Sequence, residues 1–402
     1  MNTPKIRFKG FKDDWEQRKL DTVAKFSKGS GYSKGDLIET GTPIILYGRL
    51  YTKYETSISD VDTYVEAKEG SVYSKGGEVI VPASGETAED IARAATVDKS
   101  GILLGGDLNV VMPNEDINSA FLAISISNGN SQRELAKKAQ GKSVVHIHNE
   151  EIRNLIVPFP IKAEQNRIVD YFSTLDHLIT LHQRKCDETK QLKKFMLQKM
   201  FPKNGEKKPE IRFEGFTDDW EQRKLGELVE FYNGDRSSRY PNDSDMVSEG
   251  VPFINAGDLV SGRVKLDTAN KITEEKFNEL SGAKIQRGDI IYCLRGTLGK
   301  NAFVDNFDVG TVASSLVDIR PKKVVGKYLY QVLNSDIEYT QRIVNDEGAA
   351  QPNLSAKNLS LFNIPMPDEV EQEKIAAYFD DLDNLITLHR RAYHYTKRRT
   401  YK

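Results

Sequence analysis

The sequence predicts an α+β fold: two β-rich mixed domains in pseudo-twofold duplication, separated by two long antiparallel coiled-coil-like helices. Three observations predict it. A repeat spans half of the chain, the middle of each repeat contains strand-like runs, and each repeat ends in a coiled-coil-like apolar spacing. The length of 402 residues also exceeds the roughly 150 residues of a typical domain, so two domains are expected.

The repeat is visible at both ends of each copy. Residues 5–20 and 210–225 agree at 13 of 16 positions with an offset of 205, and both contain DDWEQRKL. Residues 172–184 and 379–391 agree at nine of 13 positions with an offset of 207, and both contain LITLH. Because the offsets are almost equal, the whole unit is duplicated. Solenoid repeats are only ~20 to 50 residues long, so we expect two homologous domains.

The middle of each copy, about residues 20–155 and 225–362, is predicted to consist mainly of strands. Both middles are rich in glycine and contain short β-branched or aromatic runs such as PIILYG, GEVIVPAS, NVVMP and DIIYCL. Helical spacing interrupts them at 119–127 and at 327–345. Constant frames around unlike middles indicate one scaffold that carries two different contact surfaces.

The end of each copy is predicted to be a long helix. Apolar residues recur at alternating steps of four and three from Ile168 to Cys186 and from Ile375 to Tyr393, which is the spacing of a coiled-coil seam. The first helix, from 162 to 200, would extend about 58 Å at roughly 1.5 Å per residue, so we expect a strut. The predicted division is a first domain (1–160), a central helical spacer (161–202), a linker (203–209), a second domain (210–367) and a C-terminal helical region (368–402).

Composition and motifs argue against membrane insertion, export and catalysis. No apolar run approaches the ~18 residues of a membrane span, and the start lacks the apolar core of a signal peptide. With only two cysteines, we expect a cytoplasmic protein, and the net charge of -2 makes any basic surface local. No two prolines are adjacent, which excludes the Asn/Asp-Pro-Pro-aromatic motif of adenine methyltransferases.

Histidines do not assemble into a predicted metal or catalytic site. His146 and His148 lie two apart in a strand-like segment, but the second copy has no matching ligand set, so no metal is expected. His182 and His389 occupy equivalent seam positions, where packing or an interhelical hydrogen bond explains them. No catalytic residue is therefore assigned.

The loops of the two middles carry unlike polar residues. In the first, cations and tyrosines interleave as on nucleic-acid contact surfaces: Lys28, Tyr32, Lys34, Tyr47, Arg49, Tyr51 and Lys53. A solvated hairpin with tyrosines on a core face is equally compatible with this pattern. In the second, arginine can grip guanine and glycine lets the backbone approach DNA; the candidates are Arg236, Arg239, Asn255, Arg263, Arg295 and Lys300. The turn in the first copy that matches Arg295 carries Ser84 and Thr87 and no cation, which suggests unlike targets.

Over its whole length the chain resembles the DNA-specificity subunits of type I restriction-modification enzymes. The resemblance lies in FKGFKDDWEQRKL and its copy, GDLNVVMP, the VPFP and IPMP exits, and EQNRIVDYFSTLDHLITLHQRK with its copy EQEKIAAYFDDLDNLITLHRR. It implies that domains 1–160 and 210–367 are target-recognition domains of a non-catalytic subunit. Each would read one half of a bipartite site in double-stranded DNA.

The resemblance also implies partners. Two methyltransferase (modification) subunits would bind the helices, and restriction (motor and nuclease) subunits would join for cleavage. S-adenosylmethionine, ATP and Mg are expected on the partners, with no cofactor on this chain. The seam residues are the candidate partner contacts: Ile168, Phe172, Leu175, Ile179, Ile375, Phe379, Leu382 and Ile386.

Two alternatives remain open from the residues alone. The basic tail at 390–402 is compatible with a solvated helix end or with a contact to DNA phosphates or an acidic partner. The rival function is a non-enzymatic protein- or glycan-binding scaffold with duplicated β-rich modules. Unlike polar loops on like frames favour the DNA-binding function.

Overall fold

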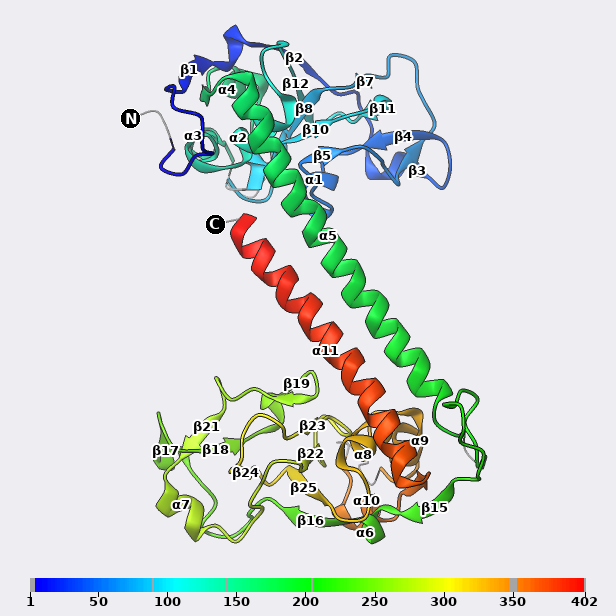
Figure 1. The fold of residues 1–402 in the computed structure, drawn as a ribbon. Coiled ribbons are helices and arrows are strands. Elements are labelled where there is room, and N and C mark those ends of the chain that lie inside the picture. The colour runs from blue at the N-terminus through cyan, green and yellow to red at the C-terminus, as the bar shows by residue number, and fades with distance from the viewer. Residues whose placement is uncertain (1–3, 89, 142–143, 204, 347–352, 401–402) are drawn as a thin grey trace. The chain divides into compact units, whose positions relative to one another are not determined.

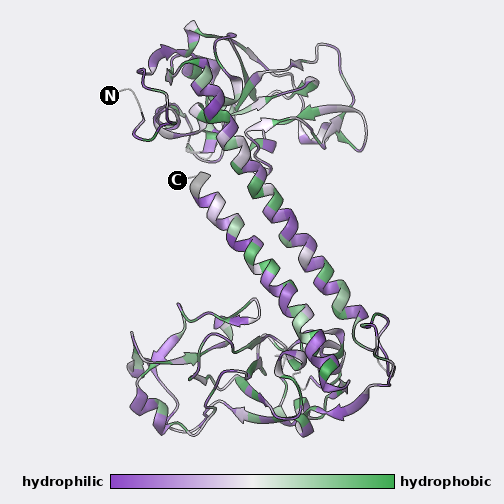
Figure 2. Ribbon diagram, in the orientation of Figure 1, coloured by the Kyte–Doolittle hydropathy of each residue, from purple (hydrophilic) through white to green (hydrophobic). Residues whose placement is uncertain are grey.

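The computed structural model describes residues 4–88, 90–141, 144–203, 205–346 and 353–400, and its contacts divide the chain into two units (Figure 1). The first unit contains residues 1–181 and 393–402, and the second contains residues 182–392. Each unit combines mixed sheets with helices, which confirms the predicted fold class. Hydrophobic and hydrophilic residues alternate along both long helices (Figure 2).

A five-stranded sheet forms the centre of the first unit. Its order is β2 (Ala24–Lys28), β12 (Leu108–Pro113), β8 (Glu78–Pro82), β10 (Ala95–Val97) and β5 (Ser57–Ile58). A second five-stranded sheet has the order β3 (Leu37–Ile38), β6 (Tyr64–Val65), β4 (Thr42–Ile45), β11 (Ser100–Leu104) and β7 (Tyr73–Lys75). Two-stranded pairs are β1 (Glu16–Lys19) with β14 (Ile156–Phe159), and β9 (Ser84–Gly85) with β13 (Val145–His146). The helices are α1 (Arg49–Thr52), α2 (Ser119–Ser127), α3 (Gly129–Lys138), α4 (Asn149–Arg153) and the start of α5 (Lys162–Lys199). The core lies where α2 covers the central sheet, and Val79, Val111 and Phe121 are buried there.

The second unit repeats this plan with four-stranded sheets in place of the five-stranded ones. The central sheet has the order β16 (Val229–Asn233), β25 (Leu316–Pro321), β22 (Ile290–Cys293) and β23 (Asn301–Phe303). A second sheet has the order β17 (Met246–Val247), β21 (Asn270–Ile272), β18 (Val251–Ile254) and β24 (Thr311–Val312). Two-stranded pairs are β15 (Glu221–Lys224) with β26 (Asn363–Met366), and β19 (Leu259–Val260) with β20 (Arg263–Val264). The helices are α6 (Leu225–Leu228), α7 (Glu274–Glu279), α8 (Gly326–Val332), α9 (Asp336–Val344), α10 (Ala356–Ser360) and most of α11 (Glu369–Thr400).

The duplicated sequence motifs form the same frame in both units. The string EQRK makes β1 and β15, and the VPFP and IPMP exits lie in or next to β14 and β26. Each pair is antiparallel, with Glu16 opposite Phe159 and Glu221 opposite Met366. The two ends of each copy are thus held together at the entrance to its long helix.

A buried glutamate and the glutamine that follows it hold the start of each long helix to the rest of its copy. Glu164 accepts two hydrogen bonds from Arg7, at 2.6 and 2.7 Å, and Glu371 accepts two from Arg212, both at 2.7 Å. The next residue in each copy, a glutamine, donates to the carbonyl of the exit proline at 2.9 Å. The start of α11 is also capped, since the Glu371 backbone amide donates to Asp368 at 2.9 Å.

One expected helix is broken. The apolar stripe at 327–345 predicted a single helical segment, and the structure has α8 and α9 instead. The first helix ends at Val332, and Ser335 caps the second: its hydroxyl accepts from the Ile337 amide and donates back to the Val332 carbonyl. Serine favours such caps over helix interiors, a preference that the apolar spacing does not report.

Within the second unit, residues 182–199 of α5 run antiparallel to α11. His182 and His389 meet with their Nδ1 atoms 3.2 Å apart, and Lys193 lies 2.7 Å from Asp383. The imidazoles share an interhelical hydrogen bond, as expected for the seam. Apolar seam positions of α11 are buried among the core side chains of this unit: Ile375, Phe379 and Leu382.

Candidate nucleic-acid interface

In each unit, three strand ends meet at one edge of the central sheet. In the second unit, β25 lies antiparallel to both neighbours, with Asn233 opposite Val317 and Cys293 opposite Leu316. The loops after β16 and β22 and the segment before β25 therefore share this edge. In the first unit, Lys28 lies opposite Asn109 and Pro82 opposite Leu108, which gathers the equivalent loops. We call these two places the loop edges.

The loop edge of the second unit carries several of the predicted cations. Arg295 is exposed, and its Nε donates to Asn353 Oδ1 at 3.3 Å. Arg236 is exposed and donates to the Ser314 carbonyl at 3.1 Å. Lys300 reaches the Ala256 carbonyl at 2.7 Å, which places its ammonium beside the loop that starts at Asn255.

Asn255, Arg239 and Arg263 have local partners. The Asn255 amide donates to Asp258 at 2.8 Å at the start of a short 3-10 turn. Arg239 donates to the Glu279 carbonyl at 3.1 Å, and Arg263 pairs with Asp305 at 3.4 Å. The structure thus gives Arg239 and Arg263 contacts away from Arg295.

The turn that carries Arg295 is closely held. The Cys293 amide donates to the Lys300 carbonyl at 2.8 Å, and Gly296 and Gly299 adopt positive φ angles of 78° and 79°. A Cβ on Gly299 would lie only 2.6 Å from Arg342 Nε, so α9 packs directly behind the turn. Glycine is required at both positions because side chains rarely adopt this backbone conformation.

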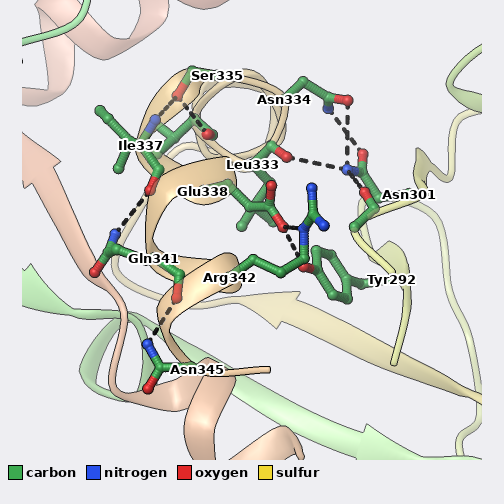
Figure 3. Close-up of polar contacts among 12 residues, drawn as sticks. Tyr292, Asn301, Leu333, Asn334, Ser335, Ile337, Glu338, Gln341, Arg342 and Asn345 are labelled. Atoms are coloured by element: carbon green, nitrogen blue, oxygen red, sulfur yellow. Dashed lines mark hydrogen bonds and ion pairs between the residues drawn. The ribbon is translucent and has the colours of Figure 1, made fainter. Parts of the chain in front are cut away.

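A buried polar cluster joins the root of this turn to α9 and to the segment before it (Figure 3). Tyr292 and Arg342 both donate to Glu338, the latter at 2.7 Å, and burial raises the pKa of the Glu338 carboxyl. Asn334 donates to Asn301 Oδ1 at 2.8 Å. The cluster fixes both strands that flank the turn, β22 and β23.

The loop edge of the first unit has different chemistry on a similar backbone. Ser84 Oγ lies 3.1 Å from His146 Nδ1 and donates to Asp107 at 3.2 Å. The Tyr51 hydroxyl donates to the Ser84 carbonyl at 2.9 Å, and burial raises the pKa of that hydroxyl. Tyr47 packs edge-on against Tyr51 with ring centroids 6.4 Å apart.

This serine, histidine and aspartate do not form a hydrolytic triad. In a triad the carboxylate orients the histidine, which then activates the serine. Here Asp107 accepts from Ser84 itself, and no hydrogen bond between Asp107 and His146 is present in the described residues. The arrangement suits recognition through hydrogen bonds.

Other candidates of the first unit are engaged in ion pairs, caps or strands. Arg49 is only 9% exposed and donates to Asp62 and Glu55 at 2.7 and 2.8 Å. Lys53 also contacts Asp62 at 2.9 Å, and the two cations lower the pKa of that carboxyl to about 2. The sequence groups Arg49 with exposed contacts, but in α1 its side chain is buried and its guanidinium is paired with two exposed carboxylates.

The remaining candidates have these positions. The Tyr32 hydroxyl accepts from the Lys68 amide at 2.7 Å, and the ring is 9% exposed. Lys34 is exposed on a 3-10 turn, and Lys28 is exposed at the loop edge. Thr87 donates to Asp90 at 2.8 Å in a local cap. Lys28, Tyr47, Tyr51 and Ser84 are therefore the predicted residues that the first loop edge gathers.

Two loop-edge residues are not identified by the sequence patterns. The spacing of His146 suggests only a metal ligand, and no pattern distinguishes Asn353. They occupy the same place: His146 pairs with Ser84 across β9 and β13, and Asn353 forms a bridge with Arg295. The offset of 207 that relates the long helices also relates these two residues, and that signal was available in the sequence.

The helical seam residues differ in burial between the two copies. In the first unit, Ile168 packs against the core, and Phe172, Leu175 and Ile179 are half-buried. In the second unit Ile386 is half-buried, whereas the other seam residues named above are buried in the core. Two leucines of the duplicated LITL string are exposed in α11, Leu385 at 44% and Leu388 at 60%.

Clustered metal ligands and membrane-spanning helices are absent from the described residues. Within those ranges, no group of three or more His, Cys, Asp or Glu side chains is placed to hold a metal ion. In the same residues, no helix has the length and apolar character needed to cross a bilayer. Both cysteines, Cys186 and Cys293, are free and buried.

Comparison with known proteins gives consistent matches. Residues 12–191 and 217–394 each match the family model for the type I restriction modification DNA specificity domain. The MjaVIII specificity subunit of a type I restriction enzyme from Methanocaldococcus jannaschii is 23% identical over 394 residues, which covers 94% of this chain and 88% of the relative.

Two solved structures share the fold. An S subunit of a type I restriction-modification system from M. genitalium gives a TM-score of 0.60 at 15% identity and covers 99% of this chain and 95% of that one. A chain from a structure on complex assembly and conformational transition of the type I R-M system gives 0.54 at 18% identity and covers 99% of this chain and 96% of that one.

Proposed function

The chain belongs to the type I restriction modification DNA specificity family, whose model matches both of its copies, and we propose how it selects DNA. It is a non-catalytic specificity subunit, as its relatives are. Each unit reads one half of a bipartite sequence in double-stranded DNA through its loop edge. The chemistry of methylation and cleavage belongs to the partner subunits.

One observation carries the proposal for the loop edges: equivalent backbone positions hold unlike polar side chains. Ser84 and His146 stand in the first unit where Arg295 and Asn353 stand in the second. A shared catalytic function would require the same groups at both places. Base recognition instead uses different donors and acceptors for different sequences.

Charge supports contact with DNA in the second unit. Arg236, Arg295 and Lys300 bring three cations to one loop edge, although the chain as a whole has a net charge of -2. Local cations hold phosphates and steer DNA, which a protein- or glycan-binding scaffold does not need. This concentration favours the DNA-binding function over the scaffold.

The long helices are the proposed docking surface for two methyltransferase subunits. Leu385 and Leu388 are exposed in α11, and their counterparts in α5 are Leu178 and Leu181, the latter 38% exposed. Leu178 is half-buried, but Leu181 and Leu388 are exposed at equivalent positions and are not required by the core, so they fit a repeated partner contact. In the complex, restriction subunits join, and S-adenosylmethionine, ATP and Mg bind to the partners. The cytoplasm is the proposed location.

Selection of DNA by the assembled complex tests this function. The chain is purified with and without its methyltransferase subunits, and each preparation is bound to random-sequence duplexes. The expected result is enrichment by the complex of two short fixed sequences separated by a spacer of undefined sequence. Binding without enrichment, or enrichment of one continuous site, would contradict the bipartite model.

A further inference from the structure

The structure assigns a specificity role to Asn353: it holds Arg295 so that the two terminal nitrogens of the guanidinium form a fork that reads guanine. This inference rests on the proposed function and deepens it, because it names the base that the loop edge of the second unit recognises. Asn353 is a positioning residue, and Arg295 is the residue that touches the base.

The backbone fixes the spacing of the two residues. Arg295 and Asn353 face each other in an antiparallel bridge, and the Leu354 amide donates to the Leu294 carbonyl at 2.9 Å. The Asn353 amide donates to Asp346 at 2.9 Å, which anchors it a second time. The first unit has the same arrangement, in which the Ile147 amide donates to the Ala83 carbonyl at 3.0 Å. The pair therefore belongs to the fold of both copies.

The contact with Asn353 uses Nε of Arg295 and leaves its two terminal nitrogens free to donate to guanine. Its Nε donates to Asn353 Oδ1 at 3.3 Å, and it forms no salt bridge in the part of the chain that the structure describes. The two terminal nitrogens can then donate in parallel, which matches O6 and N7 of guanine. Because arginine only donates, the asparagine atom that faces Nε must be the oxygen.

The same contact disfavours an adenine reading by Asn353. Asparagine recognises adenine with its oxygen and its nitrogen together. In this structure the oxygen already accepts from Arg295, so adenine N6 would have to share that acceptor with the guanidinium. Arg295 and Asn353 together therefore favour recognition of guanine.

Neighbouring arginines are less suited to this task. Arg236 and Arg239 each donate a terminal nitrogen to a backbone carbonyl of their own unit, at 3.1 Å in both cases. These bonds fix each guanidinium against its own unit and take up one of its terminal N–H groups, which restricts the orientations open to a bidentate contact. Arg295 is held at Nε instead, on a turn that α9 supports from behind.

The counterpart pair explains why the half-sites differ. Ser84 has a short side chain whose hydroxyl donates to Asp107, while His146 is exposed. Neither side chain has a bidentate fork of donors. The equivalent position of the first half-site is therefore expected to lack the guanine preference.

Competition binding by the reconstituted complex with its methyltransferase subunits tests the inference. Duplexes carry the selected site with each base pair of the second half-site changed in turn. Arg295→Ala should reduce discrimination at one guanine by about 10- to 100-fold. Asn353→Ala should reduce discrimination at that same guanine by about 3- to 10-fold, with the other positions unchanged. Asn353→Asp, which keeps the oxygen acceptor, should retain the preference.

The controls separate the possible failures. Arg287→Ala removes an exposed arginine that pairs with Asp308 at 2.7 Å and should leave every base preference intact. If the wild-type complex selects no bipartite site, the proposed function itself is contradicted. A split site at which Arg295→Ala changes no single guanine, or at which Asn353→Ala acts on all positions equally or on none, would overturn this inference alone. Retention of preference by Asn353→Asp excludes misfolding as the cause.

Discussion

At the scale of single residues, the duplicated arginine and glutamate pairs hold each unit to its long helix. Arg7 with Glu164 and Arg212 with Glu371 have matching two-point geometry, and both glutamates are fully buried. Trp220 Nε1 also donates to Glu371, at 3.1 Å. A buried carboxylate without its partner is costly, so each arginine is required once its glutamate is present.

Arg212→Ala should therefore destabilise the second unit by about 3 to 5 kcal/mol, because it leaves Glu371 buried and unpaired. The measurement is chemical denaturation followed by tryptophan fluorescence of Trp220. Arg223→Ala is the matched control, since that arginine pairs with Glu227 at 3.3 Å near the surface and should cost less than about 1 kcal/mol. Equal losses in both variants would refute the role of burial.

Asp318 should make the second unit dependent on pH. Burial, together with the carboxylate of Asp289, raises the pKa of the Asp318 carboxyl. Folding therefore favours its neutral form: the contribution to stability is complete below the unfolded pKa of about 3.9 and is lost as pH rises toward the higher folded pKa. Asp318→Asn removes this loss.

The free energy of unfolding of Asp318→Asn, relative to the natural chain, should therefore increase between about pH 5 and pH 8, by at most about 1.4 kcal/mol per pH unit. Denaturation curves at the two pH values measure it. A difference that does not change with pH would show that Asp318 has no raised pKa in the folded chain.

The sequence indicates which residues share a surface but not which contacts each side chain makes. The sequence could indicate that Tyr47, Tyr51 and Ser84 belong to one surface, since they lie in polar loops next to strands. It could not show that Arg49 pairs with Asp62, because that contact depends on how α1 turns after β4. Asn353 was missed because a lone asparagine in a loop has no local signature.

At the scale of elements, the long helices were predictable because their period is local. Steps of four and three residues identify the buried side of α11 without knowledge of its partner. Which surface packs against that side depends on the tertiary structure. Ile375, Phe379 and Leu382 enter the core of their own unit, so a methyltransferase subunit would meet the opposite side.

This division of α11 predicts two kinds of variant. Leu385→Asp with Leu388→Asp should leave folding unchanged but reduce the number of methyltransferase subunits bound per chain from two to one. Phe379→Asp should destabilise the unit, because a buried aromatic is lost and a carboxylate is desolvated. Mass measurement of the purified complex and thermal unfolding distinguish them.

Leu361→Asp is the control for the exposed pair, because Leu361 is 52% exposed and lies outside the repeated LITL string. It should retain two methyltransferase subunits. Retention of both subunits by the double variant as well would exclude this side of the helix as the docking surface.

At the scale of the whole molecule, the duplication made the architecture predictable. Two nearly equal offsets defined two domains and two helices before any strand was assigned. The middles were predictable only as β-rich, because strand pairing depends on contacts distant in sequence. The order β2-β12-β8-β10-β5, for example, joins residues 24–28 to 108–113.

The length of α5 is expected to set the spacer between the half-sites. The helix α5 begins in the first unit and ends in the second without a break, from Lys162 to Lys199. Four residues, Leu-Lys-Glu-Ala, inserted after Thr180 would lengthen it by about 6 Å and rotate the rest of the helix by about 40°. Insertion there preserves the pairing of residues 182–199 with α11, including the contact between His182 and His389.

DNA should absorb this change by a longer spacer. B-DNA advances about 34 to 36 Å over 10 to 10.5 base pairs, so 6 Å corresponds to one or two base pairs, and each base pair adds roughly 34 to 36° of rotation. Both half-sites should keep their bases, because the loop edges are untouched, while the spacer grows by one or two base pairs. Methylome sequencing of cells that carry the insertion measures it. An active complex with an unchanged spacer would show that α5 does not set the distance, and altered half-site bases would show that the units do not read independently.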